Sequence, residues 1–532
     1  MKLSSALATL IAFQRHGHSI WASAEDHAQR KLLLNQADAA KRVDDIVKTA
    51  MASVDAGDAQ GVALPLNYVV LSANEGDTQQ LAVALRLPGV EKDQNVMIDT
   101  GSSPLVFCDK SLIEEAVNIT KTDYAQCNKY GGALSCPNDP SAGDSFYVGQ
   151  VFQGNITANN ANTGKVIASM NETYFVISSK VQNYFCDGPL NGIFGVEYSV
   201  ANRGHKLPSP DFNILSLWNQ SCEIDNKSVG ACNTANMTSV NLPASLEQTL
   251  SENVDSGIIS AEAFGLYCDY AATIGSKVDT IVPSLGIFFG GDMALNNTFF
   301  NSGTPQVAAT PNCWGEYVSY FLILKSIRVP GLNMTQSGFS QCNDYCSNAQ
   351  CYTDSGTSYL SVPLPQSECN GLVNTDDDTL KKMGSMLLDI EGVNGNTITL
   401  SLPLLWLAEQ YVTHRLFCTG TSGDFILGFP IFQHYYLAYD MGSKTVTFVD
   451  LPLSNANETE ASADGPALDG NNESSSESNE SLSSTEAVDG SELGVTIESS
   501  SGTESPSSGN HVHSTIGFLA VGSLLLAFQY IL

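Results

Sequence analysis

Two short motifs occur twice in the chain, in the same order. Residues 98–103 read Ile-Asp-Thr-Gly-Ser-Ser, and residues 353–358 read Thr-Asp-Ser-Gly-Thr-Ser. Farther along the chain, each motif has a distal segment with two apolar residues and a glycine. These segments are Gly-Ile-Phe-Gly at 192–195 and Phe-Ile-Leu-Gly at 425–428. One such tetrapeptide arises by chance with odds on the order of a few hundredths in a chain of this size. Two with the same distal signal are far rarer, so the repeat predicts two similar halves, each supplying one aspartate.

Each motif combines an aspartate with a glycine and two hydroxyl side chains. Asp99 and Asp354, once brought together, cannot both ionise easily, so the pair holds one proton and titrates as a unit. One carboxylate can then take a proton from water while the other donates to a carbonyl, which is general acid–base hydrolysis of an amide. Glycine permits the tight turn and close approach. The supporting residues are Thr100, Gly101, Ser102, Ser355, Gly356 and Thr357.

The rest of the body reads as short β-strands. Runs of Val, Ile, Leu, Tyr and Phe, broken by Gly, Asn, Asp and Pro, favour strands. They cover 80–87, 95–99, 145–153, 175–178, 285–291, 317–329, 397–402, 424–427, 435–440 and 445–449. Helical patterns are few, and 244–253 and 379–388 are the candidates. The predicted fold class is therefore mainly β.

Charge and cysteine content restrict the class of protein further. The 532 residues hold 24 Lys and Arg against 56 Asp and Glu, a formal net charge of -32, which argues against a nucleic-acid partner. Thirteen cysteines and eleven Asn-X-Ser/Thr sites indicate an oxidising, glycosylating secretory route. The candidate glycosylation sites are Asn118, Asn155, Asn171, Asn219, Asn226, Asn236, Asn296, Asn333, Asn457, Asn472 and Asn479.

The two ends of the chain carry targeting and tethering patterns. Residues 1–24 combine one lysine, a short apolar run and Ala-Ser-Ala, which is typical of a signal peptide. Residues 515–532 are apolar and uncharged behind small residues and a polar spacer, which favours a glycolipid (GPI) anchor signal, with a plain tail helix as the alternative. Residues 452–514 are rich in Ser and Glu and hold no Lys or Arg, so we interpret them as a disordered, glycosylated stalk.

The paired motifs resemble those of the pepsin family of aspartic endopeptidases, over roughly residues 64–451. The resemblance implies a bilobal, mainly β fold with an active-site cleft between two pseudo-symmetric lobes, here 64–275 and 276–451. It implies that Asp99 and Asp354 are the catalytic pair. With the anchor signal, the chain is similar to the surface-anchored members of the family, which are yapsin-like or beta-secretase-like.

Two further features follow from this resemblance. The segment 146–154 resembles the hairpin, or flap, that closes over substrate, with Tyr147 as its tyrosine. An ordinary core tyrosine in a strand is the alternative. Residues 25–63 are expected to form an inhibitory propeptide whose cations pair with acids of the body and are released in acid. An unstructured leader is the alternative here.

The chain departs from the family at three places. Val106 stands where a tryptophan usually buttresses the flap tyrosine. Residues 351–353 read Cys-Tyr-Thr where two apolar residues commonly precede the second aspartate. The two motifs are also farther apart than in typical members, and we expect the extra length around 202–241. None of these changes removes a catalytic group.

Thirteen cysteines cannot all pair within one chain. The expected disulfides are Cys369–Cys418, Cys127–Cys136 and Cys222–Cys232. The first is implied by the resemblance, since the family commonly bridges this part of the second lobe, and the other two would close short loops. The cysteines at 342–351 could suggest zinc, but the secretory context favours disulfides. We therefore expect no metal and no cofactor.

The leading functional hypothesis is a monomeric, surface-anchored endopeptidase that cleaves protein or peptide substrates best in acid. It would reach the extracellular side of the membrane through the secretory pathway, with a vacuolar or secreted location as alternatives. A catalytically silent relative that binds peptides is a second hypothesis, against which the retained motif residues speak. A structural cell-surface glycoprotein, the third, leaves the paired motifs unexplained.

Overall fold

The computed structural model describes residues 61–451 with gaps, together with a few positions between 41 and 52. The gaps lie at 74–75, 131–144, 160–165, 183, 187, 223–227, 233, 235–236, 269–280, 291–293, 296–303, 314, 340–350, 409–414 and 421–423. The predicted signal peptide, stalk and anchor signal, and nearly all of the propeptide, lie outside the described residues. No helix of the described part combines the length and apolar character needed to cross a bilayer.

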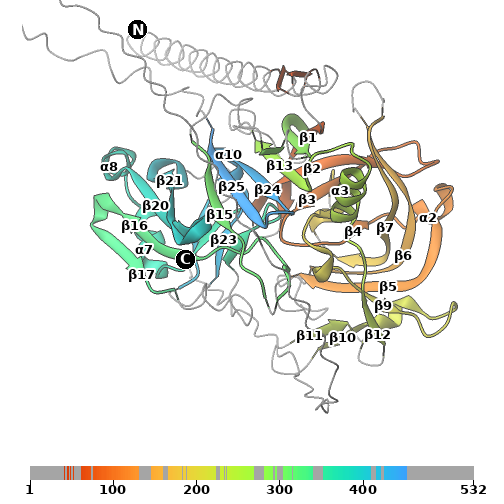
Figure 1. Cartoon of the computed structure of the whole chain (residues 1–532). Coiled ribbons are helices and arrows are strands. Elements are labelled where there is room, and N and C mark those ends of the chain that lie inside the picture. Colours follow the sequence, from red (N-terminus) through yellow and green to blue (C-terminus); the bar gives the residue numbers. More distant parts are fainter. Residues whose placement is uncertain are drawn as a thin grey trace, which may run out of the picture. The chain divides into compact units, whose positions relative to one another are not determined.

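One large sheet runs through both halves of the body (Figure 1). In sheet order its 15 strands are β12 (Thr238–Asn241), β9 (Arg203–Lys206), β5 (Thr120–Tyr130), β6 (Ser145–Asn159), β7 (Val166–Gln182), β4 (Leu105–Phe107), β8 (Gly192–Gly195), β3 (Gln94–Asp99), β2 (Gly76–Arg86), β1 (Val62–Ala73), β14 (Ile281–Phe289), β13 (Ala263–Cys268), β24 (Tyr435–Asp440), β25 (Thr445–Asp450) and β15 (Gln306–Ala309). Within this sheet, a strand of the first half, β1, pairs with a strand of the second half, β14. The return of the chain at β24, which pairs with β13, ties the two halves together.

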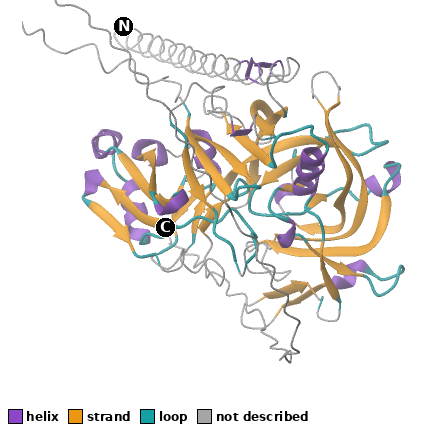
Figure 2. Cartoon of the chain, viewed as in Figure 1, coloured by secondary structure: helices purple, strands orange, loops and turns teal. Residues whose placement is uncertain are grey.

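Three smaller sheets complete the strands of the described residues. Two belong to the second half and one is a hairpin of the first. They are β17 (Met334–Ser337), β16 (Leu324–Val329), β20 (Ser385–Glu391) and β21 (Thr397–Pro403); β18 (Cys351–Thr353), β23 (Phe425–Leu427), β19 (Leu360–Val362) and β22 (Leu416–Cys418); and β10 (Trp218–Cys222) with β11 (Ser228–Cys232). Figure 2 shows that strands predominate in both halves, so the mainly β prediction is confirmed.

The sequence repeat is also a repeat of strand pairing. In the first half, β3 runs parallel to β8, and β4 pairs antiparallel with the other edge of β8. In the second half, β18 runs parallel to β23, and β19 pairs antiparallel with β23. Each half therefore threads its distal apolar segment between the strand that enters the Asp motif and the strand that leaves it. This pairing supports two pseudo-symmetric lobes joined through the shared sheet.

The helices of the described body are short. They are α2 (Leu112–Glu115), α3 (Ser245–Asp255), α7 (Gln366–Val373), α8 (Asp377–Met383), α9 (Leu404–Ala408) and α10 (Phe429–His434). The helix expected over 244–253 is confirmed as α3. The helix expected over 379–388 is wrong in its second part, because α8 ends at Gly384, where φ is 82°, and the chain continues as strand β20. A φ of this sign favours glycine and ends helices.

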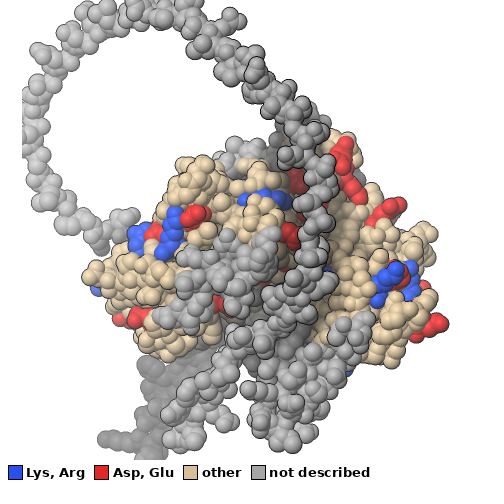
Figure 3. All heavy atoms as spheres, turned by 60° about the horizontal axis from the view of Figure 1, so that its bottom comes forward, with Lys and Arg blue, Asp and Glu red and all other residues tan. Residues whose placement is uncertain are grey.

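The buried core consists of the apolar faces of these sheets. The motif strand β3 and its partner β8 are buried almost throughout, and each has an uninterrupted apolar centre, Val-Met-Ile in β3 and Ile-Phe in β8, as strands covered on both faces require. Most charged side chains of the described residues lie at the surface, and the buried ones are few. On the face drawn in Figure 3, basic side chains form small groups, most of them beside acidic ones.

One charged network lies within the second lobe, on β16, β20 and β21. Asp389 accepts hydrogen bonds from Arg328 Nε and Nη2 at 2.6 Å each, from Ser326 at 2.5 Å and from Thr399 at 2.7 Å. These donors, the Arg328 guanidinium first, lower the pKa of Asp389 to about 2. Its contribution to stability is therefore present above its ordinary pKa and is lost as the pH falls toward 2.

We expect Asp389→Asn to lower the free energy of unfolding by about 1 kcal/mol at pH 5, a value discounted for the partial exposure of Arg328. The difference from wild type should shrink to near zero by pH 2. Thermal unfolding of both proteins between pH 5 and pH 2 measures it. Asp93→Asn, which removes the more exposed Arg86–Asp93 pair, is the control and should have a smaller effect. A difference that grows on acidification would contradict the assignment.

Candidate active site

The two motif aspartates lie at equivalent ends of equivalent strands. Asp99 is the last residue of β3, and Asp354 directly follows β18. Each strand end is fixed by its partner, because Val196 N–H donates to the Asp99 carbonyl at 2.9 Å and Asp354 N–H donates to the Leu427 carbonyl at 3.0 Å. Both side chains are buried, with 5% of Asp99 and 9% of Asp354 exposed. The fold therefore brings together two carboxyl groups that are 255 positions apart in the chain.

Each carboxylate is held by the same two donors from its own motif. The Asp99 Oδ1 atom accepts from Gly101 N–H at 2.8 Å, and its Oδ2 atom accepts from the Ser102 hydroxyl at 2.5 Å. The second lobe repeats this arrangement. Gly356 N–H donates to Asp354 Oδ1 at 2.8 Å, and the Thr357 hydroxyl donates to Oδ2 at 2.6 Å. Four of the six predicted supporting residues, namely Gly101, Ser102, Gly356 and Thr357, thus contact a carboxylate.

The motif glycines let the two carboxylates approach each other. A Cβ atom added to Gly101 would lie 2.8 Å from Asp354 Cγ. A Cβ atom added to Gly356 would lie 2.7 Å from Asp99 Oδ1 and 3.1 Å from Asp354 Oδ1. The Oδ1 atoms of Asp99 and Asp354 therefore lie close to the same point, which a side chain at Gly356 would occupy. The arrangement leaves them close enough for one water molecule to contact both.

The residue after each aspartate, Thr100 in the first motif and Ser355 in the second, forms hydrogen bonds between the two lobes. The Thr100 hydroxyl donates to the Thr353 carbonyl at 3.1 Å and accepts from Ser355 N–H at 3.0 Å. The Ser355 hydroxyl donates to the Ile98 carbonyl at 2.7 Å and accepts from Thr100 N–H at 3.1 Å. These four bonds form a symmetric, buried crosslink between the motifs, as expected for Thr100 and Ser355.

The electrostatics of the pair favour one retained proton. Burial raises the pKa of Asp99 well above its ordinary value, and the neighbouring Asp354 carboxyl raises it further. The Ser102 and Gly101 donors act in the opposite direction but are outweighed. The two carboxyl groups therefore share one proton and titrate as a unit. A buried pair with one proton can act as acid and base in the same step.

Some residues of the site could not be recognised from the sequence. Gln80 Nε2 donates to the Gly356 carbonyl at 2.9 Å and to the Ser358 hydroxyl at 3.2 Å. The Tyr439 hydroxyl donates to the Thr353 hydroxyl at 3.0 Å. Both are contacts across more than 80 positions of chain, so no local pattern indicates them. Gln80 lies in a predicted strand, but the residue that it faces depends on how the lobes dock.

The predicted flap tyrosine takes the packing of a core residue. Tyr147 lies in β6, paired with Asn128 of β5 and Val181 of β7, and only 1% of it is exposed. Its hydroxyl donates to Gln126 Oε1 at 3.2 Å. These contacts are those of the alternative, a buried tyrosine within a strand. The flap assignment of Tyr147 stays a prediction, and the burial of the side chain is what the alternative expects.

The disulfides correct two of the three expected pairs. Cys369 is bonded to Cys418, as the resemblance implied. Cys127 is bonded to Cys232, so Cys127–Cys136 and Cys222–Cys232 are both wrong. Sequence proximity was a poor guide, because the β10–β11 hairpin returns to strand β5.

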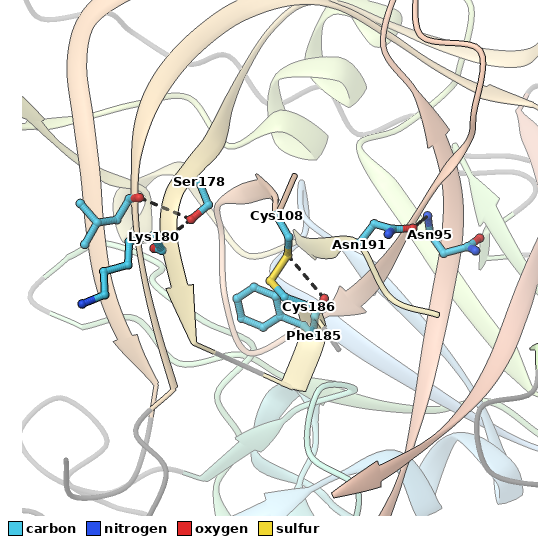
Figure 4. Close-up of a disulfide and its surroundings, with 8 residues drawn as sticks. Asn95, Cys108, Ser178, Lys180, Phe185, Cys186 and Asn191 are labelled. Carbon is cyan, nitrogen blue, oxygen red and sulfur yellow. Dashed lines mark hydrogen bonds between the residues drawn. A yellow bond between two sulfur atoms is a disulfide. The ribbon is translucent and has the colours of Figure 1, made fainter. Parts of the chain in front are cut away.

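A further disulfide, Cys108–Cys186, was not predicted (Figure 4). It links the segment after β4 to a short 3-10 helix, Tyr184–Cys186, just before β8. Asn191 flanks it, since Asn191 N–H donates to the Asn95 carbonyl at 2.7 Å and the Asn191 carbonyl accepts from Cys108 N–H at 2.9 Å. This crosslink braces the strands that carry Asp99. Cys313 and Cys351 are disulfide-bonded too, and Cys268 is buried.

The described residues contain no group of three or more His, Cys, Asp or Glu side chains arranged to hold a metal ion. Among the glycosylation candidates, those with described side chains are exposed at the surface: Asn118, Asn155, Asn171 and Asn333. Asn226, Asn236, Asn296, Asn457, Asn472, Asn479 and Cys136 lie outside the described residues, and glycosylation remains a prediction at all eleven sites.

Comparisons with known proteins give a likeness to solved structures only. No protein-family model matches the sequence, and no curated protein matches it. Among solved structures, the chain is similar to the aspartic proteinase from Irpex lacteus, with 13% sequence identity and a TM-score of 0.46. The likeness covers 74% of this chain and 99% of that one.

Proposed function

We propose that this protein is an aspartic endopeptidase that hydrolyses internal peptide bonds by activating water between Asp99 and Asp354. The observation that carries the proposal is the symmetric carboxyl pair. Each carboxylate is oriented by one glycine N–H and one hydroxyl, and each motif glycine leaves room for the opposite aspartate. A pair that served only to stabilise the fold would not need two buried acids facing each other, because burying them costs free energy.

The proposed reaction needs no covalent intermediate. The ionised carboxylate takes a proton from the water as its oxygen attacks the peptide carbonyl carbon, and the protonated carboxyl donates to the carbonyl oxygen. A neutral tetrahedral diol forms, and one proton remains on the pair. The diol then returns a proton to a carboxylate while the leaving nitrogen is protonated, and the C–N bond breaks. The pair ends with the single proton with which it began.

The working conditions follow from this proton count. Activity requires one proton on the pair, so we expect an acidic optimum, with protein or peptide chains as substrates. We place the enzyme in the secretory route, which the three described disulfides favour. Tethering to the outer side of a membrane through 452–532, as a monomer, is part of the proposal and rests on the sequence.

The proposal is tested with purified full-length protein and a denatured protein substrate at pH 4. We expect internal cleavage that pepstatin blocks and that is absent in Asp99→Asn. Unchanged cleavage in Asp99→Asn would refute the assignment. Binding of peptides without any cleavage, in the wild type, would instead favour the catalytically silent relative.

A further inference from the structure

Glu197 is a buried acid that the proposed reaction does not use. Four acidic side chains of the described residues are buried: Asp99, Glu197, Asp354 and Asp389. Asp99 and Asp354 form the reacting pair, and Asp389 is neutralised by Arg328. Glu197 is 6% exposed and forms no ion pair with any residue that the structure describes. A buried carboxyl without a cation is costly unless it stays neutral, so its presence calls for a reason.

The backbone places Glu197 against the first motif. It lies two residues beyond Gly195, which pairs with Asp99 across β3 and β8. Its N–H donates to the Ser102 carbonyl at 2.9 Å, and the Ser102 hydroxyl in turn holds the Asp99 carboxylate. Any displacement of Glu197 therefore moves a residue that orients the reacting pair.

The side chain of Glu197 faces the second lobe. The buried Ser319 hydroxyl and the charge of Asp354, both of the second lobe, act on the Glu197 carboxyl. Next to Ser319, the Tyr320 hydroxyl donates to the Val196 carbonyl at 2.5 Å, which fastens the same loop across the lobe boundary. Glu197 thus lies between the two lobes, close to the second aspartate.

The groups around Glu197 cannot compensate a negative charge. The ionisable side chains that act on it or sense its charge are Asp354, Tyr352, Tyr320 and Tyr198. These tyrosines are kept neutral by burial, which raises the pKa of each, and Asp99, Asp424, Glu247 and Asp440 add only negative charge to the cluster. One cation, Lys444, contacts this cluster, and its Nζ atom lies 4.5 Å over the ring of Tyr198.

We propose that Glu197 is a positioning residue of the Asp99–Asp354 pair, which supports the pair while its carboxyl is neutral and limits the working range at alkaline pH once it ionises. This inference rests on the proposed function. In its neutral form the carboxyl can donate to the Ser319 hydroxyl. Ionised, it places a second negative charge beside Asp354 in a buried site, and the Ser102 loop must move to expose it.

The protonation behaviour of Glu197 agrees with this role. Burial first, and the Asp354 charge to a smaller extent, raise the pKa of Glu197 to about 8, although Ser319 acts in the opposite direction. Because the native state binds this proton more tightly than the unfolded state, stability falls as the pH rises from the ordinary value of 4.5 toward 8. The carboxyl is neutral throughout acidic conditions.

The first test measures thermal unfolding of the full-length protein between pH 4 and pH 7.5. Glu197→Gln keeps the shape and removes the ionisation. We expect its Tm to equal that of wild type at pH 4 and to exceed it by roughly 5 °C at pH 7.5. Glu197→Asp retains an ionisable group and should keep the wild-type trend, and Glu114→Gln, at an exposed position of α2, should change neither value. A Tm difference that is the same at both pH values, or that appears equally in Glu114→Gln, would overturn the proposal.

The second test separates positioning from stability alone. In Glu197→Gln we expect the alkaline limb of kcat/KM to move up by about half a pH unit or more while the acidic limb stays in place. An unmoved alkaline limb together with the expected Tm shift would reduce Glu197 to a structural residue and overturn the positioning role. Absence of peptidase activity in wild type would refute the proposed function instead, and the unfolding test would still decide whether Glu197 ionises as described.

Discussion

Asp354→Asn is expected to lower kcat/KM for a peptide substrate by about 10³-fold or more at pH 4, with little change in KM. The amide has the size of the carboxyl group and can still meet the Thr357 hydroxyl and Gly356 N–H. It cannot accept a proton from water, however, so the base of the reaction is lost. Because Asp354 acts on the reacting water rather than on the peptide chain as a whole, substrate affinity should survive.

The measurement is steady-state cleavage of one fluorogenic peptide by wild type, Asp354→Asn and Thr357→Val. The Thr357 variant removes only the donor to Asp354 Oδ2, so it should retain more activity than the Asn variant, with a loss of about tenfold. Equal losses in both variants would mean that orientation rather than proton transfer is being measured. Full activity in Asp354→Asn would contradict the mechanism.

Gly101→Ala is expected to reduce kcat by about 100-fold without removing any reactive group. The added Cβ would lie 2.8 Å from Asp354 Cγ and 2.9 Å from Asp354 Oδ1, closer than real Cβ atoms approach. Either the Asp354 carboxylate or the first turn must shift, and both belong to the reacting pair. The shift should also cost about 1 to 3 kcal/mol of stability, as overpacking of a filled site does.

The matched control is Gly371→Ala. Gly371 lies inside helix α7, and a Cβ there would have no atom within 4 Å. The same substitution should therefore leave kcat unchanged and raise stability by about 0.5 to 1 kcal/mol, since alanine is the better helix former. Activity with peptide substrate and thermal unfolding of both variants check the pair of predictions. A Gly101→Ala enzyme with wild-type kcat would show that the two lobes do not meet as described.

The parts of the fold that could be predicted are those with a local signal. The mainly β class follows from short apolar runs, and the strand expected at 435–440 has the bounds of β24. The strand expected over 317–329 is confined to Leu324–Val329. Tyr320, which precedes it, contacts the other lobe, because its hydroxyl donates to the Val196 carbonyl. The Asp motifs could be recognised because they occur twice in the chain, and this repetition distinguishes a functional turn from a chance match.

The remaining features depend on the way distant segments dock. Tyr147 has a sequence neighbourhood typical of a flap, yet the register of β5, β6 and β7 encloses it. Cys127 pairs with Cys232 because a hairpin folds back over β5, which spacing along the chain does not reveal. Glu197 reads as one more acid in a strongly acidic chain. Only its burial beside Ser102 and Ser319 distinguishes it, and burial is a property of the packed lobes.

The pH dependence of kcat/KM for the wild-type protein tests the central claim most directly, because it counts the protons that the active form holds. Two carboxyls that share one proton give a bell-shaped profile in acid, with one proton lost on the alkaline limb and one gained on the acidic limb. We predict this bell for the full-length protein acting on an uncharged peptide, with negligible activity left at alkaline pH. A profile that rises through a single ionisation to a plateau at neutral pH would contradict the shared proton and with it the proposed mechanism.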